Sequence, residues 1–109
     1  MANPFRGEVE LTIDGEQRVM RLTLGALAEL EAKLKCESLI EMITRFETGG
    51  FRVRDLIGLL TAGLNGGGWK IGEDDLVKSQ IDGGPLAAAQ AAAQLLKITF
   101  TLPHEDEEA

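Results

Sequence analysis

The sequence predicts an α+β fold that is mainly α, with an N-terminal β-hairpin followed by about five short helices. Strict alternation of apolar and polar residues predicts the hairpin over residues 6–24. Apolar residues spaced three and four apart, between glycine- and proline-containing breaks, predict a helical bundle over residues 24–102. We expect 1–102 to be one domain, because 109 residues with 44% hydrophobic content suit a single core. The acidic tail 103–109 is predicted to be disordered.

Two alternating runs meet at a turn signal in the predicted hairpin. Asp14-Gly15 is a dipeptide whose residues both tolerate positive φ, which is the strongest short-range signal for a hairpin turn. A lone hairpin is barely stable in water, so its apolar face needs a helix or a neighbouring subunit to cover it. The alternating apolar residues are Val9, Leu11 and Ile13 on the first strand and Met20, Leu22 and Leu24 on the second.

Capping residues and glycines mark the first two helices. Thr23 can cap a helix over about 24–35, in which Leu27, Leu30 and Leu34 form the apolar stripe. A second helix is predicted to begin after Ser38 and to end near residue 46. Gly49-Gly50 follows it as a stop signal.

The third helix is predicted over about 54–64, with Asp55 at its positively polarised N-terminus. Its leucines and isoleucine cover most of its circumference, which is typical of a central, buried helix. Gly58 and Ala62 lie four residues apart and are expected to let a neighbouring element approach closely.

The last two helices are predicted over about 73–81 and from Pro85 to about residue 100. Proline suits the first turn of a helix because that N–H has no helical partner. The final helix has an apolar stripe at three- and four-residue spacing. It can lie across the other helices as a lid on the core, or present part of the stripe to a partner. The lid is favoured because a small domain needs every apolar face. The stripe consists of Leu86, Ala89, Ala93, Leu96 and Phe100.

The run Gly66-Gly67-Gly68-Trp69-Lys70 raises the question of a phosphate-binding loop. A P-loop needs Gly-x-x-x-x-Gly-Lys followed by Ser or Thr, after a strand and before a helix. Here no hydroxyl follows the lysine, and the preceding element is a predicted helix. We therefore expect the glycines to end the third helix and Trp69 to fold back against the core edge. The alternative is an exposed Trp69 that anchors a partner.

The sequence predicts no catalytic, cofactor or metal site, and we expect no enzyme. Cys36 is the single cysteine, and the single histidine, His104, lies in the predicted tail, so a nucleophile with a positioned base is missing. Glu73-Asp74-Asp75 lacks the alternate-position spacing and glycine of a calcium loop. These acids instead suit the first turn of a helix.

The formal net charge of -7 argues against binding to nucleic acid or to anionic membranes. No apolar run reaches the roughly 18 residues that a membrane span needs. The N-terminus lacks the apolar region of a signal peptide, and one cysteine fits a reducing compartment. We therefore expect a cytoplasmic protein.

Several stretches resemble small proteins encoded in gene transfer agent and related prophage tail clusters of alphaproteobacteria. The resemblance extends from residue 2 to about residue 100. Its most specific parts are structural signatures, and none is a catalytic motif. They are "NPFRGE" at 3–8, "LGAL" at 24–27, "GGW" at 67–69 and "IDGGP" at 81–85.

The resemblance implies a role in tail morphogenesis, and the family is described both as a tail tube protein and as a tail assembly chaperone. Tube subunits of long-tailed phages are β-sandwiches, and one hairpin followed by helices cannot supply those strands. We therefore expect a chaperone that binds the tape measure protein before the tail tube polymerises. Copies stacked along that partner would make it a homo-oligomer. The alternative is a structural tail component, either tube-associated or a tail-completion protein.

The expected partners are thus the tape measure protein and/or the tail tube protein. A small regulatory or toxin-neutralising module is a third possibility that only the acidity supports. The residues expected to bind the partner are Leu86, Ala89, Ala93, Leu96, Phe100 and Trp69.

Overall fold

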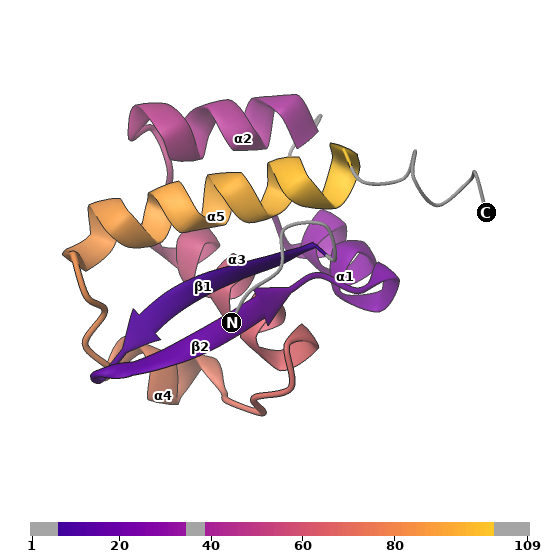
Figure 1. Ribbon diagram of the computed structural model, residues 1–109. Coiled ribbons are helices and arrows are strands. Elements are labelled where there is room, and N and C mark those ends of the chain that lie inside the picture. Colours follow the sequence, from indigo (N-terminus) through magenta and orange to yellow (C-terminus); the bar gives the residue numbers. More distant parts are fainter. Residues whose placement is uncertain (1–6, 35–38, 102–109) are drawn as a thin grey trace.

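The computed structural model describes residues 7–34 and 39–101. Within them, a two-stranded antiparallel hairpin precedes five helices, which confirms the predicted fold class (Figure 1). The strands are β1 (Glu8–Ile13) and β2 (Glu16–Arg21). The helices are α1 (Leu24–Leu34), α2 (Leu39–Thr48), α3 (Val53–Gly66), α4 (Glu73–Val77) and α5 (Gly84–Thr101).

The hairpin has the turn that the sequence predicts. Asp14 has φ 52° and Gly15 has φ 82°, so both turn residues are left-handed, as the twist of a two-residue hairpin requires. The register runs from Glu8 opposite Arg21 to Ile13 opposite Glu16. Alternation therefore sends one face of β1 into the core. The inward residues are Val9, Leu11 and Ile13.

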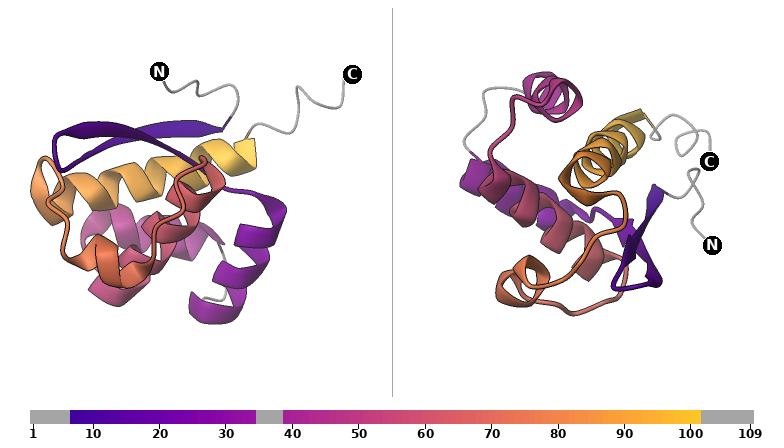
Figure 2. Two further views of the ribbon diagram at one scale, coloured as in Figure 1. Left: turned by 90° about the horizontal axis from the view of Figure 1, so that it is seen from below. Right: turned by 90° about the vertical axis from the view of Figure 1, so that its left-hand side faces the viewer.

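Helix α5 lies between the hairpin and α2, as two directions of view show (Figures 1 and 2). It packs against α2, β1 and α3. Helix α3 contacts β2, α1, α4 and α5, which confirms that it is central. The hairpin therefore obtains the helical cover that a two-stranded ribbon needs.

The side chains of the core come from every element. They are overwhelmingly aliphatic, as expected of a chain with few aromatic residues. The buried hydrophobic residues are Val9, Leu11, Ile13, Met20, Leu22, Leu30, Met42, Phe46, Leu56, Leu59, Leu60, Leu64, Leu76, Ala88, Ala89, Ala92, Ala93, Leu95 and Leu96.

Two predicted helix ends are confirmed. The Thr23 Oγ1 accepts a hydrogen bond of 3.1 Å from the Ala26 N–H at the start of α1. Gly49, with φ 87°, follows the last residue of α2. The expected cap at Ser38 lies outside the described residues, as do Cys36, His104 and the tail 103–109.

Helix α4 is shorter than predicted: it ends at Val77 rather than near residue 81. The residues after it leave the helix and bind the hairpin instead. The Asp14 N–H donates to the Gln80 carbonyl (2.8 Å), and the Gln80 N–H donates back to Asp14 Oδ1 (2.8 Å). The Asp82 N–H donates to the Thr12 carbonyl (3.0 Å). Pairing with the hairpin thus replaces the last helical turn.

The glycines 66–68 end α3 and let it approach β2. A Cβ on Gly66 would collide with the carbonyl oxygen of Arg21, and one on Gly67 with that of Val19. Gly68 has φ 110°, which favours glycine. The predicted helix-ending role of this run is confirmed.

The close approach expected at Gly58 is displaced along the same helix. A Cβ on Gly58 would meet only the Glu73 Oε2 at 3.8 Å, an ordinary contact. A Cβ on Gly63 would lie 2.8 Å from Leu95 Cδ2 and 3.2 Å from Met20 Cβ. The close packing of α5 and β2 against α3 therefore requires a glycine at position 63.

Candidate functional site

The α5 stripe predicted to bind a partner is divided between core and surface. Ala89, Ala93 and Leu96 are at most 3% exposed, because α2 and the other neighbours of α5 cover them. Leu86, in the first turn, is 64% exposed. The side chain of Phe100 lies outside the described part of the structure. Ala89, Ala93 and Leu96 thus belong to the lid on the core that the sequence favours. Leu86 is the residue of this stripe whose described side chain is exposed, and its role in partner binding stays a prediction.

Trp69 folds back against the core edge. It is half-buried, and its backbone N–H donates to the Leu64 carbonyl at 2.9 Å. The Arg18 guanidinium carbon lies 3.9 Å from the ring centroid, and Arg18 also pairs with Glu16 at 2.8 Å. A cation therefore covers one face of the indole. A partner-binding role for Trp69 stays a prediction.

An open groove of about 1030 Å³ lies where α3, α4, the hairpin turn and the segment leading into α5 meet. Most of its lining is aliphatic. The floor includes Leu56 and Leu60, which belong to the core, and the edges include Val53 and Val77. The apolar lining residues are Val53, Leu56, Ile57, Leu60, Leu76, Val77, Ile81, Pro85 and Ala88.

The short α4 explains why this groove exists. After Val77 the chain turns away to pair with the hairpin, so no further helical turn covers the N-terminal half of α3. Val53 is left 62% exposed and Val77 55% exposed. They are two of the exposed large aliphatic side chains in the described parts of the chain, together with Leu24, Ile40 and Leu86.

The charges that line the groove are both negative. Asp14, in the hairpin turn, and Asp82, before α5, are exposed at the same end of the groove. No lysine or arginine is among its lining residues within the described chain. Arg52, Arg54 and Lys78 adjoin the groove in sequence without lining it.

A smaller cavity of about 440 Å³ separates α1 from α3. The buried Thr61 Oγ1 lies there without a hydrogen-bond partner among the described residues. Asn65 Nδ2 donates to the Thr61 carbonyl (2.7 Å) and to the Ile71 carbonyl (3.0 Å). These bonds fasten the loop after α3 to the helix, which is a structural role. Where the chain is described, no three His, Cys, Asp or Glu side chains are grouped so as to hold a metal.

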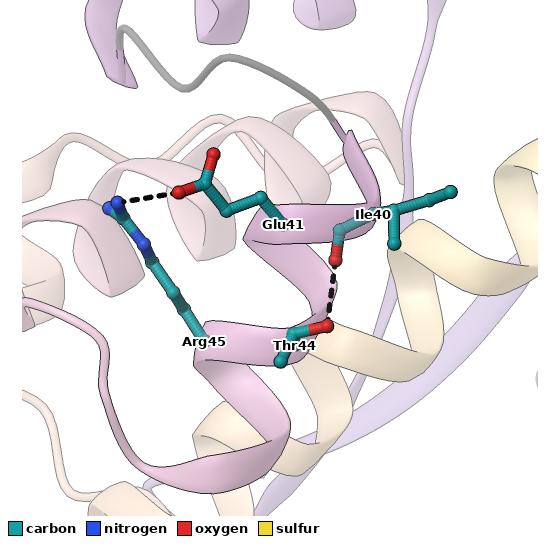
Figure 3. Close-up of polar contacts among 4 residues, drawn as sticks. All are labelled: Ile40, Glu41, Thr44 and Arg45. Carbon is teal, nitrogen blue, oxygen red and sulfur yellow. Dashed lines mark hydrogen bonds and ion pairs between the residues drawn. The ribbon is translucent and has the colours of Figure 1, made fainter.

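Helix α2 presents a different surface. Its Arg45 Nη2 donates to Glu41 Oε2 at 3.1 Å, and Thr44 Oγ1 donates to the Ile40 carbonyl at 3.0 Å (Figure 3). Ile40 is 76% exposed beside these polar groups. An ion pair between Glu47 and Lys97 links α2 to α5. Among the described side chains, this face therefore presents Ile40 beside polar groups.

The groove was not predicted from the sequence. Val53 lies just before the predicted start of the third helix, and the pattern places Val77, with Leu76 and Ile81, on the inward face of the fourth. That placement of Val77 is wrong, because the side chain is 55% exposed. Val53 on α3 and Val77 on α4 line the same groove because of where α4 ends. Helix ends are the least certain part of a sequence-based prediction. Within the described residues, no helix is long and apolar enough to cross a membrane.

Comparison with known proteins places the chain in a family. A family model described as phage tail tube protein, GTA-gp10, matches residues 6–101. Neither the curated proteins nor the solved structures gave a significant match. This family description names the tail tube and neither a chaperone nor a tape measure, so it favours the structural alternative. The chain belongs to this phage tail tube protein family of gene transfer agents.

Proposed function

We propose that the protein is a non-enzymatic structural component of a phage-like or gene transfer agent tail, associated with the tail tube. The observation that carries this proposal is the family match, which spans residues 6–101 and whose description names the tube. Partners would then be the tail tube subunit and further copies of the chain.

The fold supports a position on the tube rather than in its wall. The described residues form one two-stranded sheet. The backbone carbonyls of Val19 and Arg21 on β2 lie against the glycines 66–67 at the end of α3. The end of β1 is bound by residues 80–82 through backbone hydrogen bonds. Helical and loop segments thus occupy positions where neighbouring strands of a continuous tube sheet would pair.

A second candidate is the tail assembly chaperone, which would bind the tape measure protein before the tube polymerises. Two features favour it: the largely helical body and the open apolar groove. Covering apolar stripes on a long partner would prevent their aggregation. Many copies on one partner would gain avidity from individually weak contacts.

Mass spectrometry of purified particles, combined with co-expression pull-downs, distinguishes the two candidates. A structural component should be present in particles in a fixed ratio to the tail tube subunit and should bind that subunit. Absence from particles, together with a soluble complex with the tape measure protein, would replace the proposal with the chaperone. Absence from particles without either complex would overturn both.

A matched pair of variants tests whether the predicted partner residue takes part. Leu86→Gln and Ile40→Gln each replace an exposed aliphatic side chain, on α5 and α2 respectively. If Leu86 contacts the partner, Leu86→Gln should recover less of the partner in the pull-down, and Ile40→Gln should recover as much as the wild type. Equal retention by both would exclude Leu86 from the interface.

A further inference from the structure

We propose that the groove between α3, α4 and the hairpin turn is a docking site for an amphipathic helix of a protein partner, one with a leucine-type stripe flanked by lysine or arginine. The inference goes beyond the proposed function, because it assigns a surface and a ligand chemistry whichever tail protein is bound.

The shape and lining of the groove favour a macromolecule. Its volume of about 1030 Å³ is at the top of the range for small-molecule pockets, but small-molecule sites also hold enclosed, converging polar groups. Here the polar lining is exposed or half-buried, and the edges are the exposed aliphatic side chains of Val53 and Val77. An open apolar trough of this kind suits the side chains of one helix face.

A helix suits the groove better than an added strand. Strand addition requires an accessible sheet edge. At the end of β1 that lines the groove, the Thr12 carbonyl already accepts from Asp82 and the Asp14 N–H already donates to Gln80. The occupant therefore gains its binding from apolar contacts rather than from backbone pairing.

Charge selects among possible helices. The carboxylates of Asp14 and Asp82 stand at one end of the groove, and the lining within the described chain contains no cation. A lysine or arginine flanking the apolar stripe would lie near these carboxylates, whereas an acidic helix would be repelled. A second copy is disfavoured for the same reason, because each copy carries a formal net charge of -7.

The first experiment titrates the ¹⁵N-labelled protein with a synthetic 18-residue peptide that has leucine at positions i, i+3, i+4 and i+7 and lysine on its other face. We expect amide shift changes confined to the groove elements, at residues 12–15, 53–60 and 76–88. A peptide of the same composition in scrambled order, and one with glutamate in place of lysine, should bind at least about tenfold more weakly. Equal binding by the scrambled peptide, or shifts spread over the whole surface, would overturn the proposal.

Groove variants test the apolar contribution. Val77→Gln should weaken peptide binding about tenfold, because an exposed aliphatic contact is lost. Ile40→Gln on α2 is the matched control and should bind like the wild type. Circular dichroism checks that both variants fold. If Val77→Gln is folded and binds normally, the groove is not the site.

A second pair tests the charges. Asp82→Asn should weaken binding about threefold at low salt, with the difference vanishing at high salt. Asp74→Asn removes the same charge from α4 outside the groove lining and should have no such effect. Equal losses in the two variants would mean non-specific attraction and would contradict the charge selection.

Sedimentation of the wild type tests whether a second copy occupies the groove. A dimer that Val77→Gln dissociates would make a second copy the occupant and would overturn the proposed partner.

Discussion

The C-terminal half of α3 is closed on the side that faces β2 and α5, whereas the N-terminal half is open to the groove. At the closed half, Gly63, Gly66 and Gly67 bring the helix against β2 and α5, and Leu64 is completely buried. At the open half, Val53 is 62% exposed and the groove separates α3 from α4. One helix therefore anchors the fold at one end and offers apolar surface at the other.

The comparison extends to α5, which runs beside both halves. Leu95 meets Gly63 at the closed half, and Ala88 lines the groove at the open half. Aliphatic residues of similar chemistry thus have different roles that depend on which half they occupy. Stability should therefore depend on the buried residues that pack at the closed half, and binding on the exposed groove residues of the open half.

The largest expected effect is that of a polar side chain buried in the closed half of α5. Leu96→Gln should destabilise by about 5 kcal/mol and leave the chain largely unfolded, because it removes a buried leucine and buries an amide. Leu86→Gln, on the same stripe but 64% exposed, should change the free energy of unfolding by less than about 0.5 kcal/mol. Urea denaturation followed by circular dichroism measures both. A stable Leu96→Gln protein would show that the stripe is not core.

The next effect tests the glycine approach directly. Gly67→Ala should cost about 3–4 kcal/mol, because its Cβ would collide with the Val19 carbonyl, which is backbone and cannot move aside cheaply. Gly72→Ala is the control, since a Cβ there meets nothing within 4 Å and φ is -95°. Thermal unfolding of the two variants compares them. Equal melting temperatures would show that the close approach at Gly67 does not hold the closed half together.

A third pair compares truncations within α3 itself. Leu64→Ala should destabilise by about 2–3 kcal/mol through the cavity that it leaves. Val53→Ala, at the exposed start of the helix, should stay within about 0.5 kcal/mol of the wild type. Urea denaturation measures the free energy of unfolding of both variants, with one common dependence on urea concentration used for the two fits. A comparable loss at Val53 would mean that the open half also carries the fold.

The smallest effect concerns the contact that covers the closed half. A double-mutant cycle of Arg18→Ala and Trp69→Ala should give a coupling of about 0.5–1 kcal/mol, the value of a partly exposed cation–π pair. A coupling near zero would leave Trp69 as a simple apolar plug, without help from Arg18.

The sequence predicted the hairpin, the five helices and the helix-ending glycines because each depends on local chemistry. Asp14-Gly15 needs only its own φ preferences, and Thr23 needs only the N–H groups of the next turn. The end of α4 could not be predicted, because hydrogen bonds between Gln80 and Asp14, 66 residues apart, decide it. The groove depends on that ending, so it was missed as well. Likewise, the α5 pattern alone could not distinguish a stripe covered by α2 from one offered to a partner.

The bonds between the hairpin turn and residues 80–82 also bear on the order of events during synthesis. The hairpin is synthesised before residues 80–82, so the Asp14 turn cannot form its hydrogen bonds with Gln80 until the chain has grown by a further 66 residues. A two-stranded ribbon has little stability by itself. The hairpin strands, although made before the helices, are therefore among the last elements to become fixed. A chain truncated before α5 would lack the element that packs on β1, and we expect it to remain unfolded and open to proteolysis.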